Sequence, residues 1–292
     1  MKKKWSLFSI AFLTPAFIFY TLFIILPVLF SIYYSFTRWN LGKQPELIWF
    51  ENYIRLFGEP TYWKVVGNTL SLALYTVIFQ ISLGLIFAYL LFLTLKGFKF
   101  FRTVYFVPVV VAPVTIGIIF SLFYNSDLGP LNKLLDMIGL QNLTRNWLSD
   151  IKVVLYSVIA PQVWQYIGLF AVILLAGMQS IPNEIFDSAK IDGASSFRIL
   201  LSIVIPLISE FLGICFILAV TGSLKSFDTS WALTKGGPGY ESAYIATMMY
   251  KSAFMNYQFG YASAVTVTIL IYAVTFTVIF KKILSRYSME KL

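Results

Sequence analysis

Six long stretches of this 292-residue chain are almost free of charged residues. Five contain no Asp, Glu, Lys or Arg, and the sixth contains only Glu210. Each is longer than the roughly 20 apolar residues that a helix needs to cross the hydrocarbon of a bilayer. None alternates apolar and polar residues along its length, which favours helices over the strands of a membrane barrel. The sequence therefore predicts an all-α integral membrane protein, one transmembrane domain over 1–292, with helices at 6–37, 65–95, 103–126, 153–180, 199–224 and 252–280.

The composition supports this class and excludes several others. Only 12% of the residues are charged, whereas a soluble domain is usually about a quarter charged. The chain has no His and one Cys, Cys215, which excludes an internal disulfide, a Cys/His zinc site and His-based catalysis. Cys215 is predicted to be a small apolar filler within a helix. No G-x-x-x-x-G-K-[ST] loop for ATP phosphates occurs. We expect no catalytic residue, no metal and no cofactor in this chain.

An ion-coupled carrier or a membrane-embedded enzyme is the alternative from a different class. Coupled carriers commonly place several ionisable residues along their ion path, but Glu210 is the only one in the predicted spans. An enzyme needs a set of catalytic groups, and none is recognisable here. A transporter of this composition would take its energy from another chain.

The distribution of basic residues predicts the topology. The segments 1–5, 96–102, 184–198 and 281–292 carry 12 of the 22 Lys and Arg residues in less than half the length of the segments on the other side. Short loops rich in Lys and Arg stay on the cytoplasmic side of a membrane. Both termini are therefore predicted to be cytoplasmic, in a multi-pass membrane protein. The net charge of +9 follows from this topology, so we do not expect a nucleic-acid partner.

The cytoplasmic segment 181–198, between the fourth and fifth spans, carries signals for two short helices. Pro182 suits a first helical turn, and Glu184 places negative charge near the positive end of that helix. Gly193 then supplies a break, and Ser195 or Ser196 can cap the next helix. The segment is therefore predicted to be a helix–turn–helix between two spans.

An apolar stripe runs along the first of these helices. Ile181, Ile185 and Ala189 recur every four residues, and Phe186 lies beside them. The stripe could pack on the protein's own helix ends or dock into a soluble partner. Periodicity alone favours packing within the protein.

The same segment resembles the cytoplasmic "EAA" loop of permease subunits in binding-protein-dependent ABC importers. The sugar-type branch reads like I-P-x-E-L-Y-E-A-A-x-I-D-G-A, followed by an aromatic residue and I-x-x-P. Asp187-Ser188-Ala189 stands here where the family has Glu-Ala-Ala, which keeps one acidic and two small residues. The positions that match are Ile181, Pro182, Glu184, Ala189, Ile191, Asp192, Gly193, Ala194, Phe197, Ile203 and Pro206.

Three further motifs extend the resemblance over nearly the whole chain. Residues 51–57 are similar to the family's "NYxxLF" stretch and are followed by Asn68-Thr69. Residues 126–132 resemble its second outer loop. Residues 227–239 resemble the "FD…LTxGGPG" of the third outer loop in the first-type permease, of which maltose and glycerol-phosphate permeases are examples.

The resemblance implies a type I ABC importer permease fold, a location in the bacterial inner membrane and a set of partners. A second, related permease would complete a heterodimer, and two ATPase subunits would bind ATP and Mg²⁺ below it. An extracytoplasmic binding protein would deliver the solute, and membrane lipid would surround the pair. The residues that contact the ATPase would be Glu184, Asp187, Ser188, Ala189, Asp192 and Gly193, and those that contact the binding protein would be Asp228, Gly236, Gly237 and Pro238.

The resemblance also fixes a register for residues along the solute pathway. Aromatic rings stack on the C–H faces of a sugar, and amides bond its hydroxyls. An aromatic belt at the membrane surface is the other reading of these residues. Glu210 should face the bundle, either in the pathway or bonded to a neighbouring helix. The residues assigned to the pathway are Gln162, Trp164, Tyr166, Glu210, Ser223 and Ser226.

The expected solute is a sugar or an oligosaccharide. The same motifs occur in the branch that imports glycerol phosphate, so that compound or another polyol-like solute is the alternative. A phosphate-bearing solute favours Arg or Lys in the pathway. The predicted spans contain neither residue, which favours a neutral sugar.

Overall fold

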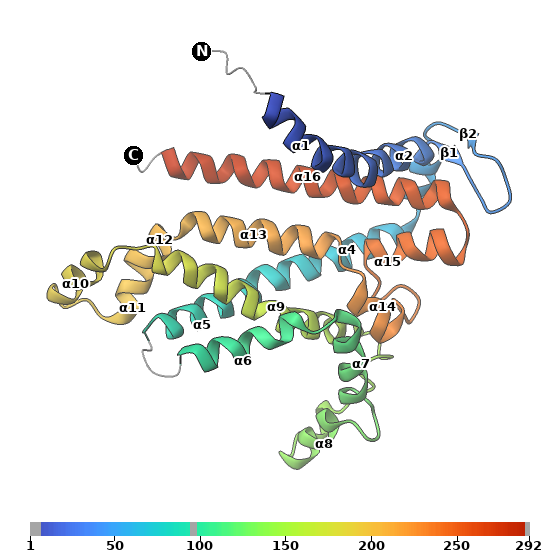
Figure 1. Ribbon diagram of the computed structural model, residues 1–292. Coiled ribbons are helices and arrows are strands. Elements are labelled where there is room, and N and C mark those ends of the chain that lie inside the picture. Colours follow the sequence, from blue (N-terminus) through green and yellow to red (C-terminus); the bar gives the residue numbers. More distant parts are fainter. Residues whose placement is uncertain (1–6, 94–97, 290–292) are drawn as a thin grey trace. The chain divides into compact units, whose positions relative to one another are not determined.

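The computed structural model describes the backbone of residues 7–93 and 98–289 and the side chains of 12–93 and 100–282. Nearly all of this part is helical (Figure 1). Four of its helices are long and apolar enough to cross a membrane, namely Phe12–Ser35, Pro60–Leu93, Val154–Gln179 and Phe259–Lys282. Two bent helix pairs raise the number to six if each pair is one span. This arrangement confirms the predicted all-α membrane class.

The described residues form two compact units. The first contains the residues up to Pro60 together with Met248–Leu270, and the second contains Thr61–Thr247 and the residues from Ile271 on. In the first unit, the span Phe12–Ser35 leads into a small antiparallel sheet in which Thr37 pairs with Leu47. The elements of this unit are α1 (Leu7–Tyr20), η1 (Thr21–Ile25), α2 (Leu26–Ser35), β1 (Thr37–Arg38), β2 (Glu46–Leu47), α3 (Glu51–Gly58) and η5 (Lys251–Met255).

The second unit holds the remaining helices, while α15 (Ile245–Tyr250) and α16 (Phe259–Met289) each have residues in both units. The elements of the second unit are α4 (Pro60–Tyr75), η2 (Thr76–Ile81), α5 (Ser82–Leu93), α6 (Phe98–Val110), α7 (Pro113–Phe123), α8 (Pro130–Met137), η3 (Gln141–Leu143), α9 (Val154–Gln179), α10 (Asn183–Ile191), α11 (Ser196–Ile199), η4 (Leu200–Val204), α12 (Ile205–Leu207), α13 (Ser209–Leu224) and α14 (Asp228–Thr234).

Helix α9 is the centre of the second unit, and α5, α6 and α13 pack on it. Two glycines permit the close approach of α5 and α6 to α9. A Cβ at Gly84 would come within 2.9 Å of the Phe170 Cβ, and a Cβ at Gly168 would meet the backbone of Tyr105 and Phe106. Small residues let transmembrane helices pack backbone to backbone, because lipid supplies no hydrophobic force to drive helices together.

The third span is not the continuous helix that was expected over 103–126. It consists of α6 and α7, which meet at 94°. Ala112 lies at the break in an extended conformation, with ψ 134°, because the residue before a proline is disfavoured in the helical region. The side-chain NH2 of Gln165 donates a hydrogen bond of 2.9 Å to the Val111 carbonyl beside this break.

The fifth and sixth spans also differ from the expectation. The fifth, expected over 199–224, is bent by 75° between Ser196–Leu207 and Ser209–Leu224. The π-helical turn η4 directly precedes Pro206, whose missing N–H removes a helical hydrogen bond. The sixth span begins at Phe259 rather than at residue 252, because Tyr257 adopts a left-handed conformation with φ 55°. Apolar length located the segments but not the positions of these breaks.

Candidate functional site

A cavity of about 270 Å³ lies in the second unit, between α9, α13, α14 and η2. Four of the six predicted pathway residues line it, namely Gln162 and Tyr166 on α9 and Ser223 and Ser226 at the end of α13. The carboxamide of Gln80 and the hydroxyls of Thr76 and Thr229 add further polar groups to the wall. The structure therefore brings most of the predicted pathway residues together at one place.

Hydrogen bonds fix the orientation of these side chains. The Ser226 hydroxyl donates to the Gln162 Oε1 atom at 2.8 Å, and the hydroxyls of Thr76 and Ser223 lie 3.0 Å apart. The Gln80 NH2 group donates to the Gln162 carbonyl at 3.0 Å. Ser226 occupies one lone pair of the Gln162 oxygen, so Gln162 offers a ligand its side-chain NH2 as donor and the other lone pair as acceptor. The wall is thus a preorganised set of hydroxyls and amides.

Two charged residues complete the cavity. Lys225 and Asp228 both line it, although Asp228 had been assigned to contact with a binding protein. Lys225 directly follows the last residue of α13, just beyond the boundary of the predicted span. Confining the sequence search to the uncharged stretches therefore missed it. Gln80 was also missed, because a single Gln in an apolar helix gave no signal of its own.

Trp164 does not join the cavity. Trp164 lies two residues from both Gln162 and Tyr166 in the sequence. Two residues correspond to about 200° around an α-helix, so Trp164 lies on the opposite face. It is 47% exposed. Its ring lies 5.7 Å from that of Phe120, centroid to centroid. Trp164 instead lines a separate apolar groove with Tyr75, Phe79 and Tyr156. The assignment of Trp164 to the same pathway wall as Gln162 is therefore corrected.

Glu210 also lies apart from the cavity. It is an exposed residue in the first turn of α13, directly after the break at Ile208. In the part of the chain with described side chains, it forms no ion pair and no hydrogen bond through its carboxylate. Its predicted place, in the pathway or against a neighbouring helix of the bundle, stays a prediction, because the structure contains this chain alone. A carboxylate at this position complements the positive end of the helix that the break creates.

The predicted helix–turn–helix of segment 181–198 is present as α10 and α11. Gly193 has φ 74° and open space around it, so the left-handed turn and not a close contact requires glycine there. The Ser195 hydroxyl accepts the Arg198 amide at 3.3 Å and caps α11, as expected for one of the two serines. The Tyr89 hydroxyl donates to the Ser196 carbonyl at 2.6 Å and ties the turn to α5.

The apolar stripe packs on the protein itself except at Ile185, which is 37% exposed. Ile181, Phe186 and Ala189 are buried in the core cluster around α5 and α9, and the ring of Phe186 lies 5.1 Å from that of Phe92. Ala189 therefore positions α10, and its predicted role in coupling to the ATPase would act through that position. The other residues assigned to the ATPase contact are exposed, namely Glu184, Asp187, Ser188, Asp192 and Gly193. A pair between Asp187 and Lys190, 3.2 Å apart, lies on the same open surface.

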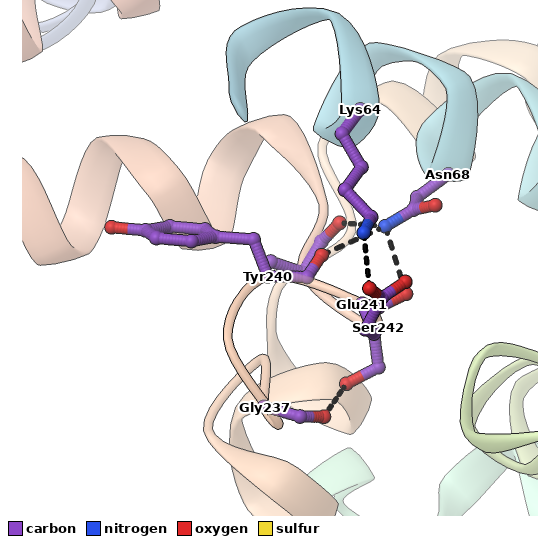
Figure 2. Close-up of polar contacts among 7 residues, drawn as sticks. Lys64, Asn68, Gly237, Tyr240, Glu241 and Ser242 are labelled. Carbon is purple, nitrogen blue, oxygen red and sulfur yellow. Dashed lines mark hydrogen bonds and ion pairs between the residues drawn. The ribbon is translucent and has the colours of Figure 1, made fainter. Parts of the chain in front are cut away.

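The loop after α14 is held by residues of α4 (Figure 2). The Asn68 side-chain NH2 lies 3.0 Å from each of the carbonyls of Tyr240, Glu241 and Ala243. Lys64 forms an ion pair with the Glu241 carboxylate. The two N–H groups of Asn68 thus serve three backbone carbonyls of the loop, with one N–H shared between two of them, which explains its place in the sequence motif.

Inside the loop, hydrogen bonds from side-chain hydroxyl groups take the place of the backbone hydrogen bonds of regular secondary structure. The Ser242 hydroxyl donates to the Gly237 carbonyl at 2.6 Å and lies 2.7 Å from the Thr234 hydroxyl. Gly236 is buried with φ 77°, and a Cβ there would lie 2.9 Å from the side chains of Ala243 and Thr247. Pro238 is exposed. Gly236 therefore shapes the loop, whereas Pro238 and the partly exposed Gly237 present its surface, so the assignment of Gly236 as a contact residue is corrected.

Sequence comparison places the chain among known proteins. Residues 80–287 match the family described as the binding-protein-dependent transport system inner membrane component. The chain belongs to this family. It is similar to the probable ABC transporter permease protein YurN of Bacillus subtilis, with 36% identity over 89% of this chain and 90% of that protein. It is also similar to the multiple sugar-binding transport system permease protein MsmF of Streptococcus mutans, with 32% identity over 89% of each chain.

The fold agrees with this assignment. A chain of a bacterial ABC transporter involved in import of the acidic polysaccharide alginate superposes with a TM-score of 0.84, 22% identity and 94% coverage of both chains. The fold is that of type I ABC importer permeases. The chain is thus a non-catalytic transport subunit, and the carrier and enzyme alternatives are set aside.

The clamp formed by Asn68 gives a direct prediction for the loop. Asn68→Leu leaves the carbonyls of residues 240, 241 and 243 without their donor, which costs about 1–3 kcal/mol for a buried group. Amide hydrogen exchange of residues 236–243 should therefore accelerate. Ser71→Ala is the matched control, because the Ser71 hydroxyl bonds only the Gly67 carbonyl of its own helix. Unchanged exchange in Asn68→Leu would show that other contacts hold the loop.

Proposed function

We propose that this chain forms part of the translocation pathway for a neutral, hydroxyl-rich solute of the sugar class. The observation that carries the proposal is the wall of Gln80, Gln162 and Ser226, where amides and hydroxyls are already held in place by hydrogen bonds. Such groups replace the water around sugar hydroxyls, and the Tyr166 ring offers a stacking face. The name of the relative MsmF, a multiple sugar-binding transport system permease, supports the same class.

The charges of the cavity favour a neutral solute over glycerol phosphate or another anionic compound. Lys225 and Asp228 line the same cavity, so their charges offset each other. A site built for phosphate presents an excess of Arg or Lys donors. Both side chains can instead bond hydroxyl groups, with Lys225 as donor and Asp228 as acceptor.

Substitutions in the cavity test this function. Gln162→Leu should raise the half-saturation concentration for sugar uptake about tenfold, because losing one buried hydrogen bond costs about 1–3 kcal/mol. Trp164→Leu is the control, since Trp164 lies on the same helix outside the cavity. Uptake is measured in cells or proteoliposomes that contain the whole transporter. Equal effects of the two substitutions would contradict the assignment of the cavity.

Four other chains complete the proposed transporter. A related second permease pairs with this chain, two ATPase subunits bind ATP and Mg²⁺ on the cytoplasmic side, and an extracytoplasmic binding protein delivers the solute. The loop around Pro238 and Gly237 is the proposed contact with the binding protein, because it is exposed and rigidly held. The cavity residues at the end of α13 and the start of α14 directly precede the rest of α14 and this loop in the sequence.

The proposed orientation places both termini, which lie outside the described residues, in the cytoplasm. Six spans return the chain to the side where it started, and the basic residues are concentrated on that side. In a Cys215→Ser background, Lys2→Cys and Leu292→Cys should both resist membrane-impermeant thiol reagents in intact cells. A cysteine in the exposed loop of the opposite side, such as Gly42→Cys, should react. Labelling at either terminus would reverse the topology.

The exposed surface of α10 and α11 is the proposed coupling element. Its docked side, through Phe186 and Ala189, is fixed to α5 and α9. Its open side carries Glu184, Asp187 and Asp192, which offer acidic contacts to an ATPase subunit. Closure of the ATPase pair on ATP would move this rigid segment together with α9 and α13, which flank it in the chain. Motion of rigid elements of this kind switches the side to which a pathway opens.

Gly193 gives the sharpest test of coupling. Gly193→Val forces a β-branched residue into a left-handed turn, which should distort the coupling surface and abolish uptake while the permease pair still inserts. Gly42→Val is the matched control, because Gly42 has φ 75° and open space around it but lies far from the loop in sequence. ATPase subunits should dissociate on detergent extraction only in Gly193→Val. Normal uptake with wild-type ATPase retention would show that another segment couples the chains.

A further inference from the structure

Helix α8 and the residues after it form a hairpin whose polar side is turned inward. The Asn132 side-chain NH2 donates to the carbonyls of Ser126 and Arg145, each at 3.1 Å. The Asn132 Oδ1 atom accepts the Trp147 indole N–H at 2.8 Å. Asn132 is buried, so a polar amide occupies the position where a water-soluble hairpin would place a Leu or Val.

The end of the hairpin is also well ordered by polar contacts. Arg145 forms an ion pair with Asp150 at 3.3 Å. The backbone amide of Lys152 and the guanidinium of Arg145 hold the pKa of the Asp150 carboxyl below its usual range. This pair lies at the surface, so polar contacts order both the buried centre and the exposed end of the segment.

The opposite side of α8 is apolar and open. Met137 is 81% exposed and Ile138 67% exposed, and Leu134 lies with them on one face at helical spacing. Asn132 lies on the other side of the helix, with Asp136 beside it. Apart from η3, no described helix makes an extended contact with α8. The hairpin thus buries the amide of Asn132 while it exposes a row of large apolar side chains.

The apolar surface is continuous with the exposed face of the preceding bent span. Ile118 and Leu122 on α7 are more than half exposed, as is Leu128 in the connection to α8. In Figure 1, α7 and α8 follow one another away from α9. Because α7 belongs to a membrane span, lipid is the natural covering for its exposed apolar side chains. The exposed apolar side chains of α8 follow these along the chain, so lipid is their natural covering as well.

The charges of this segment indicate whether lipid charge or apolar burial would drive its binding to a membrane. Residues 127–152 contain three Asp and three Lys or Arg residues, so no net attraction to anionic headgroups is expected. Lys133 is exposed on the same helix and is long enough to reach the headgroup region while its stem lies along apolar surface. Binding would depend on apolar burial rather than on lipid charge.

We propose that α8 is an interfacial helix that lies on the bilayer, with Leu134, Met137 and Ile138 inserted at the boundary between headgroups and acyl chains. Such helices bury their apolar face about 5–10 Å into this boundary. The insertion holds the outer end of α7 at the membrane surface and so supports the bend between α6 and α7. The occupant is the lipid surface, not a protein chain.

Fluorescence quenching tests the insertion in the full chain, reconstituted in phosphatidylcholine liposomes. In a Cys215→Ser background, Met137→Cys carries an environment-sensitive fluorophore, and Asp136→Cys on the other face is the matched control. Lipids brominated in the upper acyl chain should quench the label at 137 strongly and shift its emission to the blue. Aqueous iodide should quench the label at 136. Adding phosphatidylglycerol should leave both results unchanged.

The other outcomes overturn the proposal. Quenching at 137 by iodide but not by brominated lipid would place the apolar face in water. Protection from both quenchers would show that protein covers it, either a second copy or the chain itself. The experiment uses no solute, ATP or partner chain, so its result is independent of the proposed transport function.

Discussion

The absence of water in a bilayer is the constraint on which the rest of this structure depends. A helix break inside a membrane frees backbone carbonyls that lipid cannot satisfy. Here buried amide side chains supply the missing donors. Gln165 donates to the carbonyl beside the bend of the third span, and Asn52 donates to the carbonyls of Ser35 and Thr37 where the first span ends. The irregular backbone is possible only because these amides are placed beside it.

The same solution builds the functional parts of the second unit. Gln80 donates to two successive carbonyls of α9 and at the same time lines the cavity. Asn68 holds the loop that presents Pro238. Asn68 lies in α4 and Gln80 in η2, so the one span Pro60–Leu93 supports both the cavity and the loop. The hydrogen bonds of these two amides therefore both stabilise the fold and shape the functional parts.

Helices α9 and α13 join the cavity to the proposed coupling loop. Gln162 lies in the first half of α9, and the chain enters α10 three residues after α9 ends. The two helices also pack closely towards that end, where a Cβ at Gly177 would lie 2.7 Å from the Phe211 ring. A close, rigid pair can carry motion of α10 to the cavity without an intervening flexible segment. This arrangement gives the coupling proposal its physical basis.

The sequence predicts which helices exist better than it predicts which of their faces are covered by neighbouring helices. Apolar length located the six spans, and the turn chemistry of Gly193 and Ser195 was correct in detail. The breaks at Ala112 and Ile208 were missed, because proline is tolerated inside many membrane helices and only tertiary contacts decide whether the helix bends. The face of Trp164 was misassigned for a related reason, since a motif fixes sequence position but not which neighbouring helix covers the residue. The stripe position of Ala189, in contrast, correctly favoured packing within the protein.

The most direct test of the account measures solute access to a cysteine at Gly222. This residue lines the cavity and has open space where a side chain would lie, so Gly222→Cys in a Cys215→Ser background should be tolerated. In the assembled transporter, the transported sugar delivered by the binding protein should slow labelling of this cysteine by a thiol reagent. Labelling from the outer side should also rise when ATP closes the ATPase pair. A labelling rate that neither the sugar nor ATP alters would contradict the claim that this cavity is part of the pathway.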